Sequence, residues 1–152
     1  MKTYLERINE QTPTRMWVNN PTPSEAKKGL EAGTFGATSN PTYLSHMLKA
    51  EETKDAALSA IDRYVRMTED DHLVVALAYQ EMIAKIAEIF LPLFQETGGE
   101  KGWVAIQGNP YRDDDIDFIL QEAHRFYEIY PNIVVKVSAT LAGIAAMEKL
   151  TS

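Results

Sequence analysis

The chain has 152 residues, of which 45% are hydrophobic and 24% charged, a composition typical of a globular domain with a core rather than of a disordered segment. The net charge of -7 argues against a surface that grips nucleic acid, and the lack of cysteine excludes disulfides, thiolate metal sites and thiol nucleophiles. The polar opening residues lack the apolar core of a signal peptide, so we expect a cytoplasmic protein, folded as a single domain over residues 1–152.

Two short apolar runs open the chain, with a helical pattern between them. The first run, 15–19, predicts a strand, and Thr22-Pro23-Ser24-Glu25 is a capping box that begins a helix. We expect this helix to end at Gly33, because glycine is the favoured residue just past a helix. The second run, 35–39, predicts another strand, which Asn40-Pro41 ends because proline cannot donate to a central ladder.

A helical insertion follows the second strand. The pattern predicts one helix over about residues 51–67 and a longer one over about 71–95, in which Pro92 kinks or ends the last turn. Charged residues recur on one face of the longer helix, which makes it amphipathic rather than a membrane span. We therefore expect no membrane partner.

Two further strands are expected at 103–107 and 133–137, with a helix over 114–130 between them and another over 141–150 at the end. The fourth run is β-branched and lacks polar alternation apart from Lys136, as in a strand buried on both faces. Strands that alternate with helices predict an α/β fold with a parallel sheet and right-handed crossovers.

Polar side chains gather where these strands end. In parallel α/β sheets the chemistry lies at the carboxyl ends of the strands, so these residues are candidates for a site, although carboxamides also serve as turn residues. They are Asn19, Asn20, Ser39, Asn40, Gln107, Asn109, Lys136, Ser138 and Thr140.

Lys136 is the unusual member of this set. Burial disfavours an ammonium group and lowers its pKa, and the neutral amine that results can attack a carbonyl carbon. The pattern equally allows a structural lysine that pairs with a carboxylate or extends to the surface.

No metal site is expected. The three histidines, His46, His72 and His124, lie on helical segments without ligand-like spacing. The acidic run Asp113-Asp114-Asp115 opens a helix, where carboxylates complement the helix dipole, so capping is the favoured interpretation.

Three stretches resemble the transaldolase family, which includes fructose-6-phosphate aldolase-like enzymes. They are 17–25, 36–42 and 135–143. The second is similar to the family's Gly-(Val/Ala)-Thr-Thr-Asn-Pro motif, and the third to its Lys-Ile-Pro-Ala-Thr motif followed by glycine. The resemblance runs from about Arg15 to the C-terminus and implies a TIM-barrel type of fold. The chain would supply four βα units, the N-terminal half of the barrel, with the helices between the second and third strands as an insertion.

The resemblance implies a class I enzyme of sugar-phosphate metabolism, in the pentose phosphate pathway. Lys136 resembles the lysine that forms a Schiff base with a ketose phosphate, whose dihydroxyacetone unit is transferred to an aldose phosphate. Asn40 resembles the asparagine that binds the substrate's hydroxyls, with Ser39 and Ser138 as neighbouring substrate-binding residues, and Thr140 resembles the threonine that places the catalytic water. No metal or organic cofactor is implied, because the iminium is itself the electron sink.

Two positions bear on proton transfer. Gln107 falls where classical transaldolases carry glutamate and the fructose-6-phosphate aldolase-like branch carries glutamine. Asn19 falls where the family's first strand ends in an aspartate that moves protons. Because a carboxamide cannot titrate, losing such a group commonly costs about 10²–10⁴ in rate.

The chain is short for a complete barrel, which needs roughly 200 residues or more. A parallel sheet with two bare edges is seldom stable alone, so we expect either a fragment or association with a second half-barrel, for example as a homo-oligomer. Three functions stay open: a transaldolase-like transferase, a simple sugar-phosphate aldolase, and a catalytically impaired half-barrel that only binds or assembles.

Overall fold

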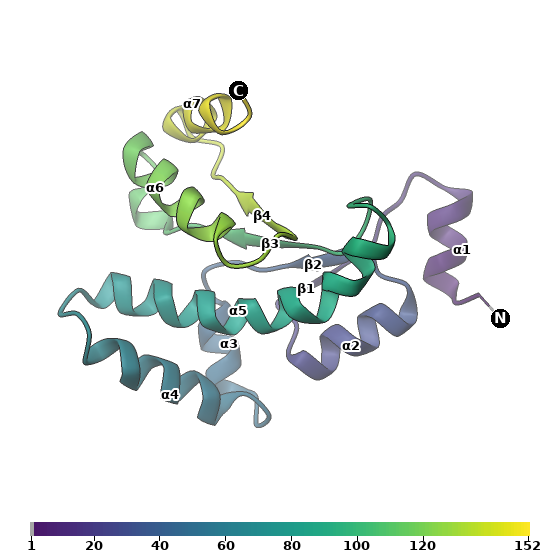
Figure 1. Ribbon diagram of the computed structural model, residues 1–152, viewed down its shortest axis with the longest axis horizontal. Helices are drawn as coiled ribbons and strands as arrows, with labels where there is room; N and C mark the ends of the chain where they lie inside the picture. Colours follow the sequence, from purple (N-terminus) through teal and green to yellow (C-terminus); the bar gives the residue numbers. More distant parts are fainter. Residues whose placement is uncertain (1) are drawn as a thin grey trace.

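Four short parallel strands form one sheet in the order β1-β2-β3-β4 (Figure 1). They are β1 (Trp17–Asn19), β2 (Gly36–Thr38), β3 (Trp103–Gln107) and β4 (Ile133–Lys136). In this computed structural model residues 2–152 are described, so Met1 of the expected domain lies outside the described residues. Because every strand pair is parallel, the carboxyl ends of all four strands meet at one edge of the sheet. The prediction of an α/β fold built from four βα units of the TIM-barrel type is confirmed.

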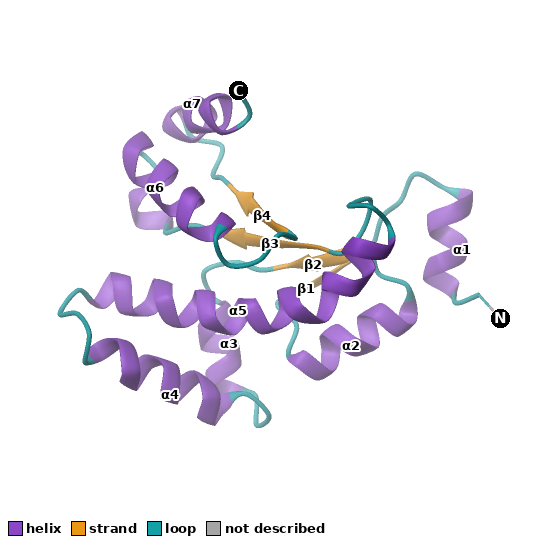
Figure 2. Ribbon diagram, in the orientation of Figure 1, coloured by secondary structure: helices purple, strands orange, loops and turns teal. Residues whose placement is uncertain are grey.

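Helices connect and flank the strands. They are α1 (Tyr4–Gln11), α2 (Pro23–Ala32), α3 (Tyr43–Lys49), α4 (Lys54–Val65), α5 (Asp71–Glu96), α6 (Ile116–Tyr127) and α7 (Leu141–Leu150), together with the 3₁₀ turn η1 (Pro110–Arg112). Figure 2 shows the helices of the insertion and α2 gathered along one side of the sheet, with α4 beside α5. Within residues 2–152, no helix combines the length and apolar character that crossing a membrane requires.

The capping signals around α2 form as the sequence predicts. The Thr22 hydroxyl accepts the Glu25 N–H, and the Glu25 carboxylate accepts the Thr22 N–H at 2.9 Å. Gly33 ends the helix with φ of 93°, a left-handed conformation that glycine adopts without steric cost. These local contacts place the start of β2 directly after the helix.

The helical insertion differs from the expected pattern. A separate short helix, α3, precedes the expected helix over 51–67, which is observed as α4. The long helix α5 spans Asp71–Glu96, close to the expected 71–95, and Pro92 lies inside it, near its end. Proline removes one N–H from the ladder, and the carbonyl that loses this partner belongs to Glu88, an exposed residue that water can solvate.

The core lies between the sheet and the helices. Alternate strand residues point into it, among them Val18, Val104, Ile106 and Ile133, and they pack against apolar side chains of α5 such as Ile83, Ile86 and Phe90. The opposite face of the sheet carries the other alternate residues, including Asn19, Gln107 and Lys136. In a barrel of this type that face lines the interior.

The expectation that β4 is buried on both faces is wrong. Ile133 is buried, but Val134 is 38% exposed and Lys136 is also exposed. The reason is position in the sheet: within residues 2–152, β4 pairs only with β3, so it is an edge strand. An apolar strand is buried on both faces only when further elements cover its second face, and within residues 2–152 no further βα unit does so for β4.

Candidate active site

Lys136 lies at the end of β4, on the face of the sheet opposite the core. Its Nζ donates a hydrogen bond to the Ser39 carbonyl at 2.9 Å, so the side chain reaches from β4 across the end of β3 to the end of β2. Partial desolvation lowers the pKa of Lys136 from its ordinary value. The amine is therefore anchored at one hydrogen while its remaining side faces the open surface.

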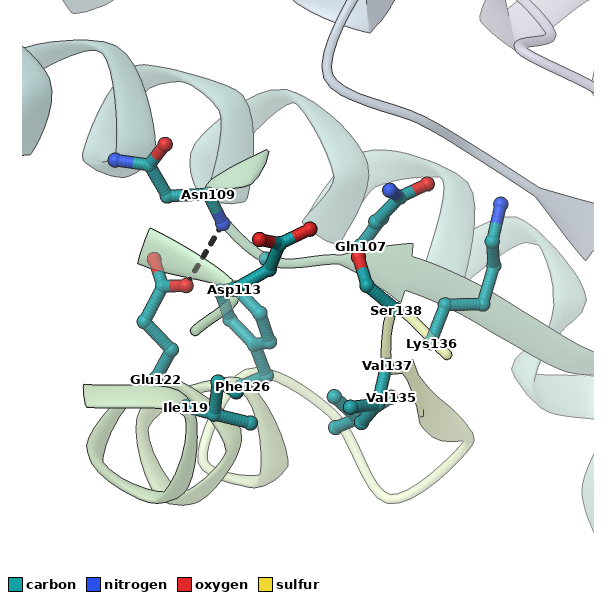
Figure 3. Close-up of a pocket in the computed structure, with 11 residues that line it drawn as sticks. Gln107, Asn109, Asp113, Ile119, Glu122, Phe126, Val135, Lys136, Val137 and Ser138 are labelled. Carbon is teal, nitrogen blue, oxygen red and sulfur yellow. Dashed lines mark hydrogen bonds between the residues drawn. The ribbon is translucent and has the colours of Figure 1, made fainter. Parts of the chain in front are cut away.

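Gln107 is the register partner of Lys136 on β3. Figure 3 shows the two side chains rising side by side from the strand ends. The backbone N–H of Gln107 donates to the hydroxyl of Tyr79 at 3.3 Å. Asn19 is the last residue of β1 and is exposed. The side chains of Asn19 and Gln107 are therefore separated by β2, which lies between β1 and β3 in the sheet.

Ser39 follows β2 and is completely buried. Its hydroxyl donates to the Ala105 carbonyl at 2.8 Å and lies 2.6 Å from the Tyr79 hydroxyl. The Ser39 side chain is thus hydrogen-bonded only to protein groups, and the Ser39 carbonyl accepts the hydrogen bond from Nζ of Lys136. A direct contact between Ser39 and substrate stays a prediction.

Asn40 is held by its neighbours in the turn after β2. Its Oδ1 accepts from the backbone N–H of Thr42 at 3.0 Å and from the Thr42 hydroxyl at 2.7 Å. Its own N–H donates to Oδ1 of Asn20, which adopts a φ of 48° at the end of β1. With its oxygen engaged in this way, Asn40 would meet a substrate hydroxyl through its Nδ2 amino group.

Thr140 caps α7 and ties it to the loop after β3. Its hydroxyl accepts the Gly143 N–H at 2.9 Å and donates to the Asp113 carbonyl at 2.5 Å. Gly143 packs directly on the backbone of Ser138: a Cβ at position 143 would lie 1.9 Å from the Ser138 carbonyl oxygen. These contacts fix the loop that leaves Lys136.

A small cavity of about 20 Å³ joins several of these groups (Figure 3). Among the residues that line it are Gln107, Asp113, Glu122, Lys136 and Ser138. A space of this size holds about one water molecule rather than a sugar. The structure thus brings Gln107, Lys136 and Ser138 together, while Asn19, Asn40 and Thr140 lie outside this cavity.

Two residues of the acidic run after β3, Asp113 and Asp115, have different surroundings. Asp115 caps α6 by accepting the Phe118 N–H at 3.1 Å, as expected of a carboxylate at a helix start. Asp113 instead lines the cavity beside Ser138. Among residues 2–152, no three His, Asp or Glu side chains are grouped so that they could hold a metal ion.

Two residues near the site carry no sequence signal of such a role. Tyr79 of α5 and Glu122 of α6 both lie within amphipathic helical patterns, where they read as core and surface residues respectively. Glu122 is buried, its carboxylate accepts the Asn109 N–H at 2.8 Å and contacts Arg125 at 3.2 Å, and burial raises its pKa. The amphipathic pattern gives no hint that Glu122 is buried, because a charged residue is expected on the solvated face of a helix.

Comparison with known proteins agrees with the motifs at the strand ends. The sequence model of the Transaldolase/Fructose-6-phosphate aldolase family matches residues 16–152. A transaldolase of Neisseria meningitidis serogroup C (strain 053442) is 30% identical over 153 residues, which cover 91% of this chain and 40% of that protein. A transaldolase of Thiobacillus denitrificans is 30% identical over 128 residues, covering 83% of this chain and 35% of that protein. The chain thus spans about 40% or less of the length of these curated relatives.

Proposed function

The chain belongs to the transaldolase/fructose-6-phosphate aldolase family, and we propose that it acts as a class I Schiff-base enzyme on sugar phosphates, with Lys136 as the nucleophile. The reaction proposed is transfer of a dihydroxyacetone unit from a ketose phosphate to an aldose phosphate. The observation that carries this proposal is the Lys136 amine, which is anchored to the Ser39 carbonyl, exposed on its other side and lowered in pKa.

The chemistry proceeds through the amine. The Nζ lone pair attacks the ketone carbon of the donor, and loss of water leaves a protonated imine. The bond between C3 and C4 breaks, its electron pair moves into the iminium to give an enamine, and the C4 hydroxyl gives up its proton as the aldehyde departs. The enamine then adds to the aldehyde carbon of an aldose phosphate, and water hydrolyses the new imine to free the amine.

Proton transfer is the weak part of this site. Asn19 and Gln107 can orient a water or a hydroxyl group but cannot accept a proton as a general base. Neither position can then take the C4 proton, and the expected penalty is about 10²–10⁴ in turnover relative to a site with a carboxylate at position 19. Imine formation depends less on such a group, so the proposal is tested first at that step.

Borohydride trapping tests the nucleophile. The protein is incubated with fructose 6-phosphate or dihydroxyacetone, reduced, and examined by intact and peptide mass. We expect a stable adduct on Lys136 that Lys136→Met abolishes, while Lys149→Met, a change at an exposed lysine of α7, leaves it intact. No adduct from folded protein would contradict the Schiff-base proposal.

The same samples separate the alternative functions. Release of aldehyde without any need for an aldose-phosphate acceptor favours a simple aldolase, in which the enamine is protonated instead of transferred. Stabilisation by a sugar phosphate without adduct or turnover favours a half-barrel that only binds. The carboxamides at positions 19 and 107, which cannot act as bases, are the observation that favours a half-barrel that only binds.

We also propose that two copies of the chain associate through the open edges of their sheets, at β1 and β4. Val134 is 38% exposed, and on α7 Leu141 is 89% and Ile144 54% exposed, although side chains of this kind are usually buried. If β4 of one copy pairs with β1 of the other, and the reverse, the strands close into a parallel barrel. Sedimentation should show a dimer that Ile144→Glu dissociates, and a folded wild-type monomer at high concentration would overturn this proposal.

A further inference from the structure

Tyr79 links the helical insertion to the edge of the sheet where the lysine stands. It lies on α5, between β2 and β3 in sequence, and is 6% exposed. Its hydroxyl lies 2.6 Å from the Ser39 hydroxyl and accepts the Gln107 N–H at 3.3 Å. One side chain thus bonds to the residue that ends β3 and to the residue that follows β2.

The directions of these bonds are determined by counting hydrogens. The single hydroxyl hydrogen of Ser39 goes to the Ala105 carbonyl at 2.8 Å. The Tyr79 hydroxyl must therefore donate to Ser39, and its lone pair accepts from Gln107. Ser39 in turn presents its own carbonyl to Nζ of Lys136 at 2.9 Å. The chain of bonds runs from α5 through Ser39 to the amine.

We propose that Tyr79 is a positioning residue for Lys136: it fixes Ser39 and Gln107 and thereby sets where the amine is held. This inference rests on the proposed function and gives a role to α5, which otherwise only covers the sheet. The hydroxyl itself does not act as an acid or base. Burial raises the pKa of Tyr79 to about 12, so the group stays protonated and neutral.

The chain offers a matched control in Tyr43. This tyrosine of α3 is also buried, its ring packs against that of Tyr79 at 5.7 Å, and its hydroxyl donates to the Pro21 carbonyl at 3.1 Å. Tyr43→Phe removes a buried hydrogen bond of the same kind as Tyr79→Phe does, but it leaves Ser39 and Gln107 untouched. A merely structural tyrosine predicts equal behaviour of the two variants.

Labelling of Lys136 with acetic anhydride across pH, read by peptide mass, gives the first measurement and needs no substrate. The groups that share its cavity and could influence it are Asp113 and Glu122, and the same two remain in every variant. A carbonyl acceptor stabilises the ammonium form more than the amine, so loosening it lowers the pKa. We expect the labelling midpoint to move to lower pH in Tyr79→Phe and to stay at the wild-type value in Tyr43→Phe.

The second measurement is the rate of borohydride-trapped adduct formation at high pH, where the amine is neutral in all variants. We expect Tyr79→Phe to slow it about tenfold, because a misplaced nucleophile loses near-attack geometry, and Tyr43→Phe to leave it unchanged. Equal midpoints and equal rates in the two variants would overturn the proposal. If Tyr79→Phe does not fold, Ser39→Ala, which removes the acceptor of the tyrosine hydroxyl, must show the same shift.

The two proposals fail in different ways. An absence of adduct in the wild type contradicts the Schiff-base function, whereas the labelling midpoints still report whether Tyr79 holds the amine. A normal adduct with identical midpoints in both phenylalanine variants contradicts the role of Tyr79 alone.

Discussion

Replacing Gly143 by alanine tests how closely α7 must approach the loop that carries Lys136. The glycine lies in the first turn of α7, with an ordinary helical backbone, so the helix alone would gain about 1 kcal/mol from alanine. The added Cβ, however, would lie 1.9 Å from the Ser138 carbonyl oxygen and 3.1 Å from a methyl group of Val137. Backbone cannot rotate out of the way as a side chain can.

The magnitude follows from that distance. The two groups must separate by about 1 Å or more to restore contact, and overpacking of this kind costs about 1–3 kcal/mol. Because the contact is with backbone, we expect the upper end of this range, about 3 kcal/mol. Helix propensity returns about 1 kcal/mol, so the net loss in the free energy of unfolding should be about 2 kcal/mol. Because Ser138 lies two residues after Lys136, a shift of about 1 Å should also slow adduct formation by about 10².

Urea unfolding and the trapping rate measure the two effects. Gly29→Ala is the matched control, since Gly29 is also inside a helix, α2, and a Cβ there would lie 3.2 Å from the Thr34 hydroxyl, a side chain that can adjust. With the same helix gain and a small cost for moving the Thr34 side chain, we expect this control to be between equal to wild type and about 1 kcal/mol more stable, and to trap normally. If Gly143→Ala matches Gly29→Ala in both stability and trapping, the close approach does not hold the loop and the reasoning is refuted.

Three further outcomes are expected. Asn132→Ala should lower the free energy of unfolding by about 2–4 kcal/mol, since the buried side chain donates to the Ala87 and Gly102 carbonyls at 2.9 Å each; an unchanged urea midpoint would contradict this. Burial raises the pKa of Glu122, so the folded protein binds more protons than the unfolded chain between the ordinary and raised values; the stability of wild type relative to Glu122→Gln should fall as pH rises through that window, and a pH-independent difference would argue against it. Asn19→Asp should raise ketose-phosphate turnover by about 10²–10⁴ by supplying a general base, and coupled assays of aldehyde release would show no gain if position 19 does not face the substrate.

Several features of the fold could be predicted because they depend on residues close together in the chain. The capping box at Thr22 and the left-handed Gly33 are set by backbone groups within one or two helical turns. The strand at 103–107 and the start of α5 after Asp70 also depend on neighbouring residues and were likewise predicted. The α1 and α3 helices escaped prediction because they are short, at 8 and 7 residues, too short for a clear periodic pattern.

The exposure of β4 could not be read from its sequence. The apolar run at 133–135 is typical of a strand that is buried on both faces. Whether the second face is covered depends, however, on what packs against it, and that is not visible in the run itself. The same holds for Lys136, whose pKa is lowered by partial desolvation although the side chain stays exposed.

The sequence by itself determined the order of strands and helices, the parallel sheet and the polar residues at its carboxyl edge, because periodicity, caps and strand direction are local properties. Only the tertiary structure decided which of those residues meet. Lys136 reaches the Ser39 carbonyl across 97 positions of the chain, and Tyr79 reaches the Ser39 hydroxyl across 40. Such contacts depend on how α5 packs beneath the sheet and on the register of β3 with β4, and neither leaves a pattern in the residues that take part.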